Sequence, residues 1–214
     1  MSHAATLRAH QTEPRSVTSA LVPALLTVWL GLILRLGATG AFVTANGAPP
    51  LGLLAAVLGP VGAFLIACRV PAVRDFALTA DLRLIAATQA WRVGGFTFLA
   101  LNAYGVLPAY FALPAGLGDM AIGVTAVWML AGLARTPAFG ASRAFVVWNV
   151  LGIVDLVVAV TVGAAVPLLF SNAAGVGSTD AMTRLPLVLI PAFFVPGFLI
   201  LHVIALAQAR RARR

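Results

Sequence analysis

Residues 84–133 read LIAATQAWRVGGFTFLALNAYGVLPAYFALPAGLGDMAIGVTAVWMLAGL and contain two long apolar segments, 84–107 and 110–133. The hydrocarbon core of a bilayer is roughly 30 Å thick and needs about 20 apolar residues as a helix, so each segment is long enough to cross it. Only a very short connection around Pro108 separates the two segments. The sequence therefore predicts two antiparallel helices that form a hairpin across a membrane.

Four further apolar segments of similar length flank this hairpin, at residues 20–43, 50–70, 145–170 and 185–207. Hydrophobic residues make up 61% of the 214 residues. Charged residues make up only 9%, against about 25% in an average soluble domain, which is too few to cover the surface of a soluble protein. This composition excludes an ordinary soluble enzyme, a disordered chain and a nucleic-acid-binding domain. We predict an all-α, polytopic integral membrane protein with six transmembrane helices in a compact bundle.

The six segments leave little chain outside the predicted membrane domain, which covers residues 17–208. Residues 1–16 are predicted to be a disordered cytoplasmic tail, and residues 209–214 a basic cytoplasmic tail. The first segment could be mistaken for a cleaved signal peptide. Its apolar run is longer than the usual 7–15 residues or so, and Arg35 interrupts it, so we interpret it as a retained helix.

All fourteen basic residues are arginines, and their positions alternate with the predicted spans. Eleven of them fall in tails and loops on one side of the membrane, whereas Arg184 alone falls on the other. Cytoplasmic segments carry an excess of basic residues, so we predict that both termini lie in the cytoplasm. Arginine without lysine is typical of a GC-rich bacterial genome, and the predicted location is the inner membrane. The eleven residues are Arg8, Arg15, Arg69, Arg74, Arg83, Arg135, Arg143, Arg210, Arg211, Arg213 and Arg214.

Five ionisable residues lie well inside the predicted spans, away from their ends, namely Arg35, Arg92, Asp119, Asp155 and His202. A rise of about 1.5 Å per helical residue lets all five meet in one central layer. A charge at this depth costs about 2.5–3.5 kcal/mol on insertion scales, so these side chains should face the bundle interior and pair. We expect Arg92 to pair with Asp119, Asp155 or both. Arg35 should either bind the other carboxylate or extend toward the membrane surface.

Two amides extend this candidate site. Gln89 precedes Arg92 by three residues on the same helix face, and Asn149 lies near Asp155 on the fifth span. Gly94 and Gly95 follow Arg92, where the backbone can approach a neighbouring element closely. The complete candidate cluster is Arg92, Asp119, Asp155, Arg35, His202, Asn149 and Gln89. We assign no catalytic residue, no metal ligand and no cofactor.

The two aspartates lie in similar local sequences. Residues 116–125 (GLGDMAIGVT) and 152–161 (GIVDLVVAVT) share Gly, Asp, Val and Thr at a constant offset. The two helices are predicted to cross the membrane in opposite directions. Such a pair is what an inverted repeat would produce. The alternative is a chance match between apolar sequences.

Three local patterns predict how individual segments pack. Small residues at four-residue spacing should form close interhelical contacts, as at Ala115 and Gly123 in the fourth span. The second span carries the same pattern at Ala55, Gly59, Ala63 and Ala67. Prolines in the sixth span predict kinks. Residues 72–82 mix charged and apolar side chains, which suits either an amphipathic helix at the membrane surface or a solvated loop.

Three functions remain compatible with the sequence. The working hypothesis is a small proton-linked transporter or channel, because burial and a nearby arginine act in opposite directions on the protonation of an aspartate. His202 would then be a candidate proton relay. The first alternative is a non-catalytic structural or assembly subunit in which the cluster holds the bundle together. The second is an intramembrane enzyme that uses the aspartate pair.

Each hypothesis predicts a different cavity. Transport requires a polar, partly hydrated cavity between the third and sixth spans, whereas a structural role predicts a dry and fully paired cluster. An enzyme would need a lateral opening to lipid beside the aspartates. The expected partners are the lipid bilayer and either a second copy of the chain or another membrane subunit, and we expect no nucleic acid.

Overall fold

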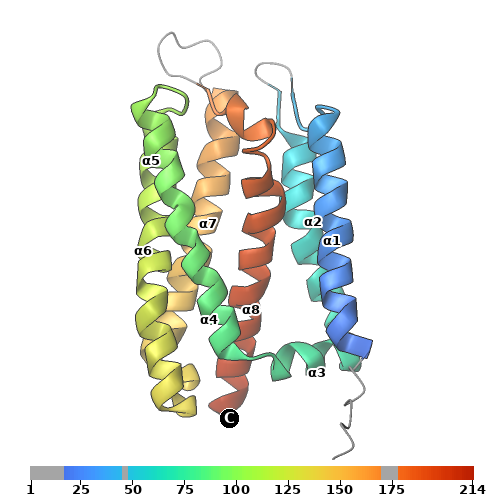
Figure 1. The fold of residues 1–214 in the computed structure, drawn as a ribbon, viewed down its shortest axis with the longest axis vertical. Coiled ribbons are helices and arrows are strands. Elements are labelled where there is room, and N and C mark those ends of the chain that lie inside the picture. The colour runs from blue at the N-terminus through green and yellow to red at the C-terminus, as the bar shows by residue number, and fades with distance from the viewer. Residues whose placement is uncertain (1–16, 45–47, 170–177) are drawn as a thin grey trace, which may run out of the picture.

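The computed structural model describes residues 17–44, 48–169 and 178–214, which are helical apart from short connections. The long helices stand side by side along one axis, and α3 lies across one end of them (Figure 1). The predicted all-α class is therefore confirmed. The elements are α1 (Val17–Ala38), α2 (Leu51–Ala67), α3 (Pro71–Thr79), α4 (Leu82–Gln89), the 3-10 helix η1 (Ala90–Gly95), α5 (Phe96–Ala103), α6 (Ala109–Arg135), the 3-10 helix η2 (Pro137–Ala141), α7 (Arg143–Leu169), the 3-10 helix η3 (Asp180–Thr183), the π-helix η4 (Ile190–Phe194) and α8 (Val195–Ala212).

Within residues 17–44, 48–169 and 178–214, five helical segments are long and apolar enough to cross a bilayer. They are α1, α4 to α5, α6, α7, and η4 to α8. Helix α2 has 17 residues and is followed by α3 at an angle of 106°, so this pair would be a sixth segment only if it counts as one broken span. Large apolar side chains lie on the outside of the bundle, including Leu25, Val28 and Trp91, each at least 70% exposed. Such a surface suits lipid better than water.

Several predicted segment ends need correction. The first segment ends at Ala38 rather than at residue 43, and the chain turns at Gly40, which has φ +71°. The second ends at Ala67 because Pro71, which lacks a backbone N–H, begins a new helix instead of continuing α2. The third ends at Ala103, just before the turn at Gly105.

The last predicted segment begins later and ends later than expected. Residues 185–188 form a turn, and the helix starts with one π-helical turn at Ile190–Phe194 around Pro191. A proline inside a helix cannot donate its hydrogen bond, which accounts for this irregular turn. Helix α8 then continues to Ala212, through most of the predicted basic tail. The predicted N-terminal tail, residues 1–16, lies outside the described residues.

The segment after the second span is a helix, α3, rather than a solvated loop. Only Ala77 is buried on it. Gln208 of α8 holds its C-terminal end, because the side-chain Nε2 donates to the carbonyl oxygens of Ala77 (3.0 Å) and Ala80 (2.9 Å). These bonds satisfy carbonyls that a helix end otherwise leaves without partners.

Replacing Gln208 with alanine is expected to loosen α3 while leaving the bundle folded. Two hydrogen bonds to the end of α3 are lost, which amounts to about 1–2 kcal/mol of local stability. Amide hydrogen exchange should therefore become faster in Pro71–Thr79 and stay unchanged in α6. Arg210→Ala, an exposed position on the same helix, is the matched control. Unchanged exchange in α3 would mean that Gln208 does not anchor it.

Helix α6 is the centre of the packing. It contacts α4, η1 and α5 on one side and α7 on the other, whereas α8 packs on α2 and α7. Ala115 and Gly123 of α6 are buried, as their spacing predicted. The same prediction is wrong for α2, where Ala55, Gly59 and Ala63 are exposed because the opposite face, with Val57, packs into the core.

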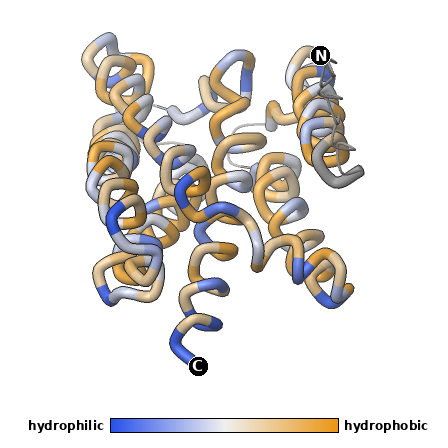
Figure 2. Tube along the Cα trace, turned by 60° about the horizontal axis from the view of Figure 1, so that its bottom comes forward, coloured by the Kyte–Doolittle hydropathy of each residue, from blue (hydrophilic) through white to orange (hydrophobic). Residues whose placement is uncertain are grey.

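Both described ends of the chain, the start of α1 and the C-terminus, lie at the end of the bundle where α3 lies (Figure 1). Hydrophilic residues gather at this end, whereas the flanks of the helices are mostly hydrophobic (Figure 2). Nine of the twelve arginines in the described residues belong to segments at this end, which we call the arginine-rich end. They are Arg69, Arg74, Arg83, Arg135, Arg143, Arg210, Arg211, Arg213 and Arg214.

Candidate functional site: a buried arginine between two aspartates

The element that carries Arg92 is not a regular α-helix. Residues Ala90–Gly95 form the 3-10 helix η1, which places Arg92 against α6 with 2% of its surface exposed. A Cβ atom on Gly95 would lie 2.9 Å from the carbonyl oxygen of Gly116, and one on Gly123 would overlap the backbone of Arg92 and Val93. The predicted close approach is thus confirmed for Gly95. It is wrong for Gly94, which has no such neighbour within 4 Å.

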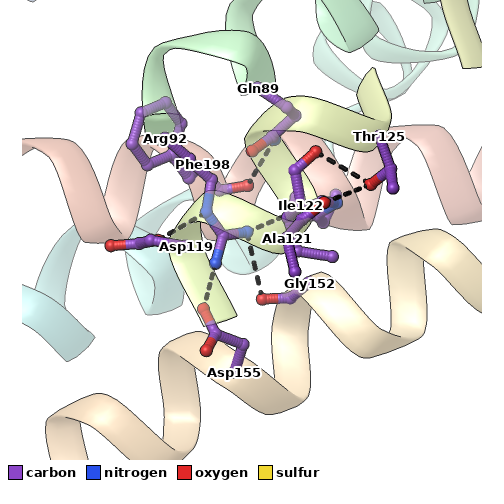
Figure 3. Close-up of polar contacts among 10 residues, drawn as sticks. Gln89, Arg92, Asp119, Ala121, Ile122, Thr125, Gly152, Asp155 and Phe198 are labelled. Carbon is purple, nitrogen blue, oxygen red and sulfur yellow. Dashed lines mark hydrogen bonds and ion pairs between the residues drawn. The ribbon is translucent and has the colours of Figure 1, made fainter. Parts of the chain in front are cut away.

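The guanidinium of Arg92 binds both aspartates (Figure 3). Its Nε donates to Oδ1 of Asp119 on α6 at 2.7 Å, and its Nη2 donates to Oδ2 of Asp155 on α7. Its Nη1 donates to the carbonyl oxygen of Gly152 at 3.3 Å. The Arg92 side chain is fully buried, and each aspartate side chain is 15% exposed. The predicted pairing of Arg92 is therefore present, with both carboxylates.

His202 extends the cluster toward the arginine-rich end. Its Nε2 lies 3.1 Å from Nη1 of Arg92. Because a guanidinium can only donate, Nε2 must accept and the ring proton must be on Nδ1. Nδ1 lies 2.8 Å from Oδ1 of Asn149, whose Nδ2 donates to the carbonyl oxygen of Phe145 at 2.8 Å. These contacts require a neutral imidazole. Each hydrogen bond in the series is donated in the same direction, from Arg92 through His202 and Asn149 to the carbonyl oxygen of Phe145.

Two predicted members lie outside this network. Nε2 of Gln89 donates to the carbonyl oxygen of Phe198 at 3.3 Å, so the amide lies beside Arg92 without binding it (Figure 3). Arg35 is exposed on α1. Its inclusion in the cluster was wrong, because α1 packs at the edge of the bundle against η4 and cannot reach the helices that surround Arg92.

The two similar segments, residues 116–125 and 152–161, make similar contacts only around their aspartates. Asp119 and Asp155 bind the same guanidinium, and a glycine lies three residues before each of them in a close contact between elements. The similarity ends at the threonines. Thr125 accepts a hydrogen bond from Nε1 of Trp148 at 2.9 Å, whereas Thr161 is exposed.

The charges of the cluster do not balance. One guanidinium faces two carboxylates, and the histidine is neutral, so the cluster carries one net negative charge when both aspartates are ionised. A buried charge without a partner is unfavourable and tends to be neutralised. A proton or another cation beside the aspartates would restore neutrality. The cluster is therefore suited to binding and releasing a cation.

One of the aspartates also borders a cavity of about 70 Å³. This cavity lies between α2, α5, α6, α7 and the segment around η3 and η4, so it is not confined to the third to sixth predicted spans. Its lining is mostly apolar rather than polar, and Asp119, Thr179, Asp180 and Thr183 are among its polar residues. A volume of about 10–15 Å³ holds one water molecule, so several waters fit. The polar residues of η3 belong to the end of the bundle opposite the arginine-rich end (Figure 1). No pattern in the sequence indicated this contribution of α2 and η3.

The other half of the bundle contains a cluster of packed apolar side chains. Apolar side chains of α4, α6, α7 and α8 fill the space between the cluster and the arginine-rich end. Trp148 is part of this packing and stands edge-on to the His202 ring, with 5.7 Å between the ring centroids. The remaining members are Ile85, Ala86, Ile122, Ala126, Leu133, Phe145 and Ala205.

Within the described residues, no three His, Cys, Asp or Glu side chains come together as a metal site requires. A family model described as a domain of unknown function (DUF8737) matches residues 49–210, from just before α2 to near the end of α8. No curated protein and no solved structure matches the chain.

Proposed function

We propose that this chain, which belongs to the family described as a domain of unknown function (DUF8737), is a small proton-linked transporter or channel. The family description gives no activity, so the proposal rests on the site itself. In this proposal the protein spans the inner membrane six times, with α2 as the short second span. The arginine-rich end lies in the cytoplasm, as the distribution of basic residues favours. The cavity beside Asp119 then opens toward the opposite side.

The observation that carries this proposal is the position of Asp119. Its carboxylate binds a fully buried guanidinium, and the same residue lines the cavity. A proton that arrives through the cavity would neutralise the excess negative charge of the cluster and weaken the hold of Arg92 on this carboxylate. Arg92 would remain paired with Asp155 on α7. Proton binding would thus change the contact between η1 and α6 in a way that can drive movement.

The other half of the bundle supports the direction of this proposal. The packed residues around Trp148 separate the cluster from the arginine-rich end, and a transporter that opens to one side at a time requires such a separation. The directed contacts from Arg92 through His202 to Asn149 continue into this packed half. These contacts place polar groups in that half. Because the guanidinium cannot give up its proton, a proton would leave on water that enters beside them once the packing opens.

Proton flux in liposomes tests this function. Purified protein is reconstituted with a trapped pH-sensitive dye, and a potassium diffusion potential, negative inside, drives protons inward. We expect acidification in wild-type vesicles and a rate about a hundredfold lower, or background, for Asp119→Asn, because the proton-accepting group is lost. The matched control is Asp75→Asn, which changes an exposed carboxylate on α3. Wild-type flux at the level of protein-free vesicles, or equal flux in Asp119→Asn, would contradict the proposal.

One observation favours the structural alternative. Arg92 connects η1, α6 and α7 through hydrogen bonds and contacts α8 through His202, so the cluster also holds four elements together. A purely structural cluster predicts no proton flux in any variant. The enzyme alternative predicts a lateral opening beside the aspartates, and the groove between α2 and α7 meets that requirement. It remains weaker, because an aspartyl dyad requires two carboxyl groups that share a proton. Here the guanidinium of Arg92 binds both carboxylates instead.

A further inference from the structure

A groove separates α2 from α7 on the side of the bundle. Helix α2 packs mainly on η4 and α8, and a groove of about 390 Å³ remains between α2 and α7. Its outer edges, Leu58 and Val157, are more than half exposed. This volume lies in the range of about 300–1,000 Å³ found for small-molecule sites. In a membrane, such a groove faces the hydrocarbon core.

The groove and the cavity beside Asp119 are adjacent. Five residues line both of them, namely Leu54, Val57, Leu156, Val160 and Ala164. The groove itself is apolar apart from Thr161. A molecule that moves from the bilayer through the groove therefore meets apolar side chains and the hydroxyl of Thr161 until it reaches the cavity.

The cavity adds a charge requirement to this apolar route. Asp119 and Asp180 line it, and none of the described residues that line the cavity or the groove is basic. Phe98 and Phe111 line the same cavity, and aromatic rings attract cations through their faces. Because the cluster carries one net negative charge, a single positive charge beside Asp119 would balance it.

We propose that hydrophobic monovalent cations enter sideways from the bilayer through the groove between α2 and α7 and bind where this groove meets the cavity beside Asp119. This inference names the substrate class of the proposed transporter and rests on that proposed function. The ligand needs an apolar body, which the groove and cavity accept, and one delocalised positive charge, which Asp119 neutralises. An anion of the same shape would add to the excess negative charge and is excluded.

Protons compete with such a ligand for the same carboxylate. The charged and titratable groups around Asp119 are Arg92 on η1, Asp155 on α7, His202 on α8 through Arg92, and Asp180 on η3. The guanidinium stays charged, so each bound hydrophobic cation replaces one proton on the aspartates. The affinity for the cation should consequently fall as the pH is lowered.

Binding of tetraphenylphosphonium tests the inference. Detergent-solubilised protein is dialysed against the radiolabelled cation, and binding to protein-free micelles is subtracted. We expect saturable binding that weakens at lower pH and is at least about tenfold weaker in Asp119→Asn, because a desolvated charge loses its partner. Asp75→Asn should bind as wild type does. Tetraphenylborate, an anion of the same shape, should not bind above the micelle background.

A second variant blocks the route and leaves the carboxylate intact. Val160→Trp fills the junction between groove and cavity and should reduce tetraphenylphosphonium binding. Val154→Trp places the same side chain on an exposed part of α7 and should have no effect. Equal binding of tetraphenylborate, or wild-type affinity in both Asp119→Asn and Val160→Trp, would overturn the inference.

The two proposals can fail separately. Proton flux that depends on Asp119 without any tetraphenylphosphonium binding would refute the substrate class and leave the proton-linked function standing. Saturable, pH-dependent binding of the cation without proton flux, with or without the cation present, would refute transport and leave the binding site standing.

Discussion

Replacing Arg92 with glutamine is expected to lower the free energy of unfolding by about 3–5 kcal/mol, the usual effect of breaking a buried ion pair. The variant leaves Asp119 and Asp155 in the bundle without the guanidinium that binds both of them. It also removes the donors to Gly152 and His202. The measurement is the thermal unfolding midpoint in detergent, followed by helical circular dichroism.

The single aspartate variants should behave differently, because the cluster carries one carboxylate too many. Asp119→Asn or Asp155→Asn leaves one arginine with one carboxylate, so we expect a change of only about 1 kcal/mol in either direction. The double variant Asp119→Asn/Asp155→Asn leaves Arg92 unpaired and should be destabilised as strongly as Arg92→Gln. Asp75→Asn, on the surface of α3, should unfold like wild type.

The relative stabilities of these variants test whether the cluster carries one more carboxylate than its single guanidinium can neutralise. Strong destabilisation by each single aspartate variant would mean that both carboxylates are needed for folding, and it would favour the structural alternative. Single variants that stay folded without proton flux would instead separate function from stability. An Arg92→Gln protein as stable as wild type would contradict the pairing itself.

Substituting Gly123 with alanine is expected to destabilise the protein by about 1–3 kcal/mol, the range for overpacking a close contact. A Cβ atom there would overlap the backbone nitrogen of Val93 and the carbonyl carbon of Arg92. Backbone atoms cannot rotate away as a side chain can, so η1 would have to move away from α6. Because η1 carries Arg92, the ion pair with Asp119 should weaken as well.

Two glycines provide controls for this effect. Gly94 lies on η1 and Gly62 on α2, and an added Cβ meets nothing within 4 Å at either position. Alanine at these sites should leave the unfolding midpoint unchanged or raise it slightly, since glycine disfavours a helix by roughly 0.5–1 kcal/mol relative to alanine. Equal midpoints for Gly123→Ala and Gly94→Ala would show that the close contact of η1 with α6 is not required.

Much of the candidate site could be predicted from the sequence, because ionisable residues are rare in apolar segments. Arg92, Asp119, Asp155 and His202 stand out for that reason, and the need to pair buried charges predicts that they meet. The same argument fails for Arg35. Depth along a helix does not give the position of that helix in the bundle, and α1 lies at the edge.

Residues without charge in the site gave weaker signals. The spacing of Ala115 and Gly123 indicated a close helix contact, but the identical pattern on α2 lies on the outside. Small residues permit close approach without requiring it, so only the arrangement of the helices decides which pattern is used. The carbonyl oxygen of Gly152 gave no signal at all, because every residue has one.

The sequence by itself determined the helical class, the approximate helical segments and four of the five ionisable residues predicted to be buried, since apolar length and the energy of burying a charge act locally along the chain. Tertiary structure alone decided that one arginine binds both aspartates and that η1 is a 3-10 helix against α6. It also decided that α2 leaves a groove beside α7, leading to the cavity at Asp119. These features depend on contacts between residues far apart in sequence, which follow from how whole helices pack and not from any single segment.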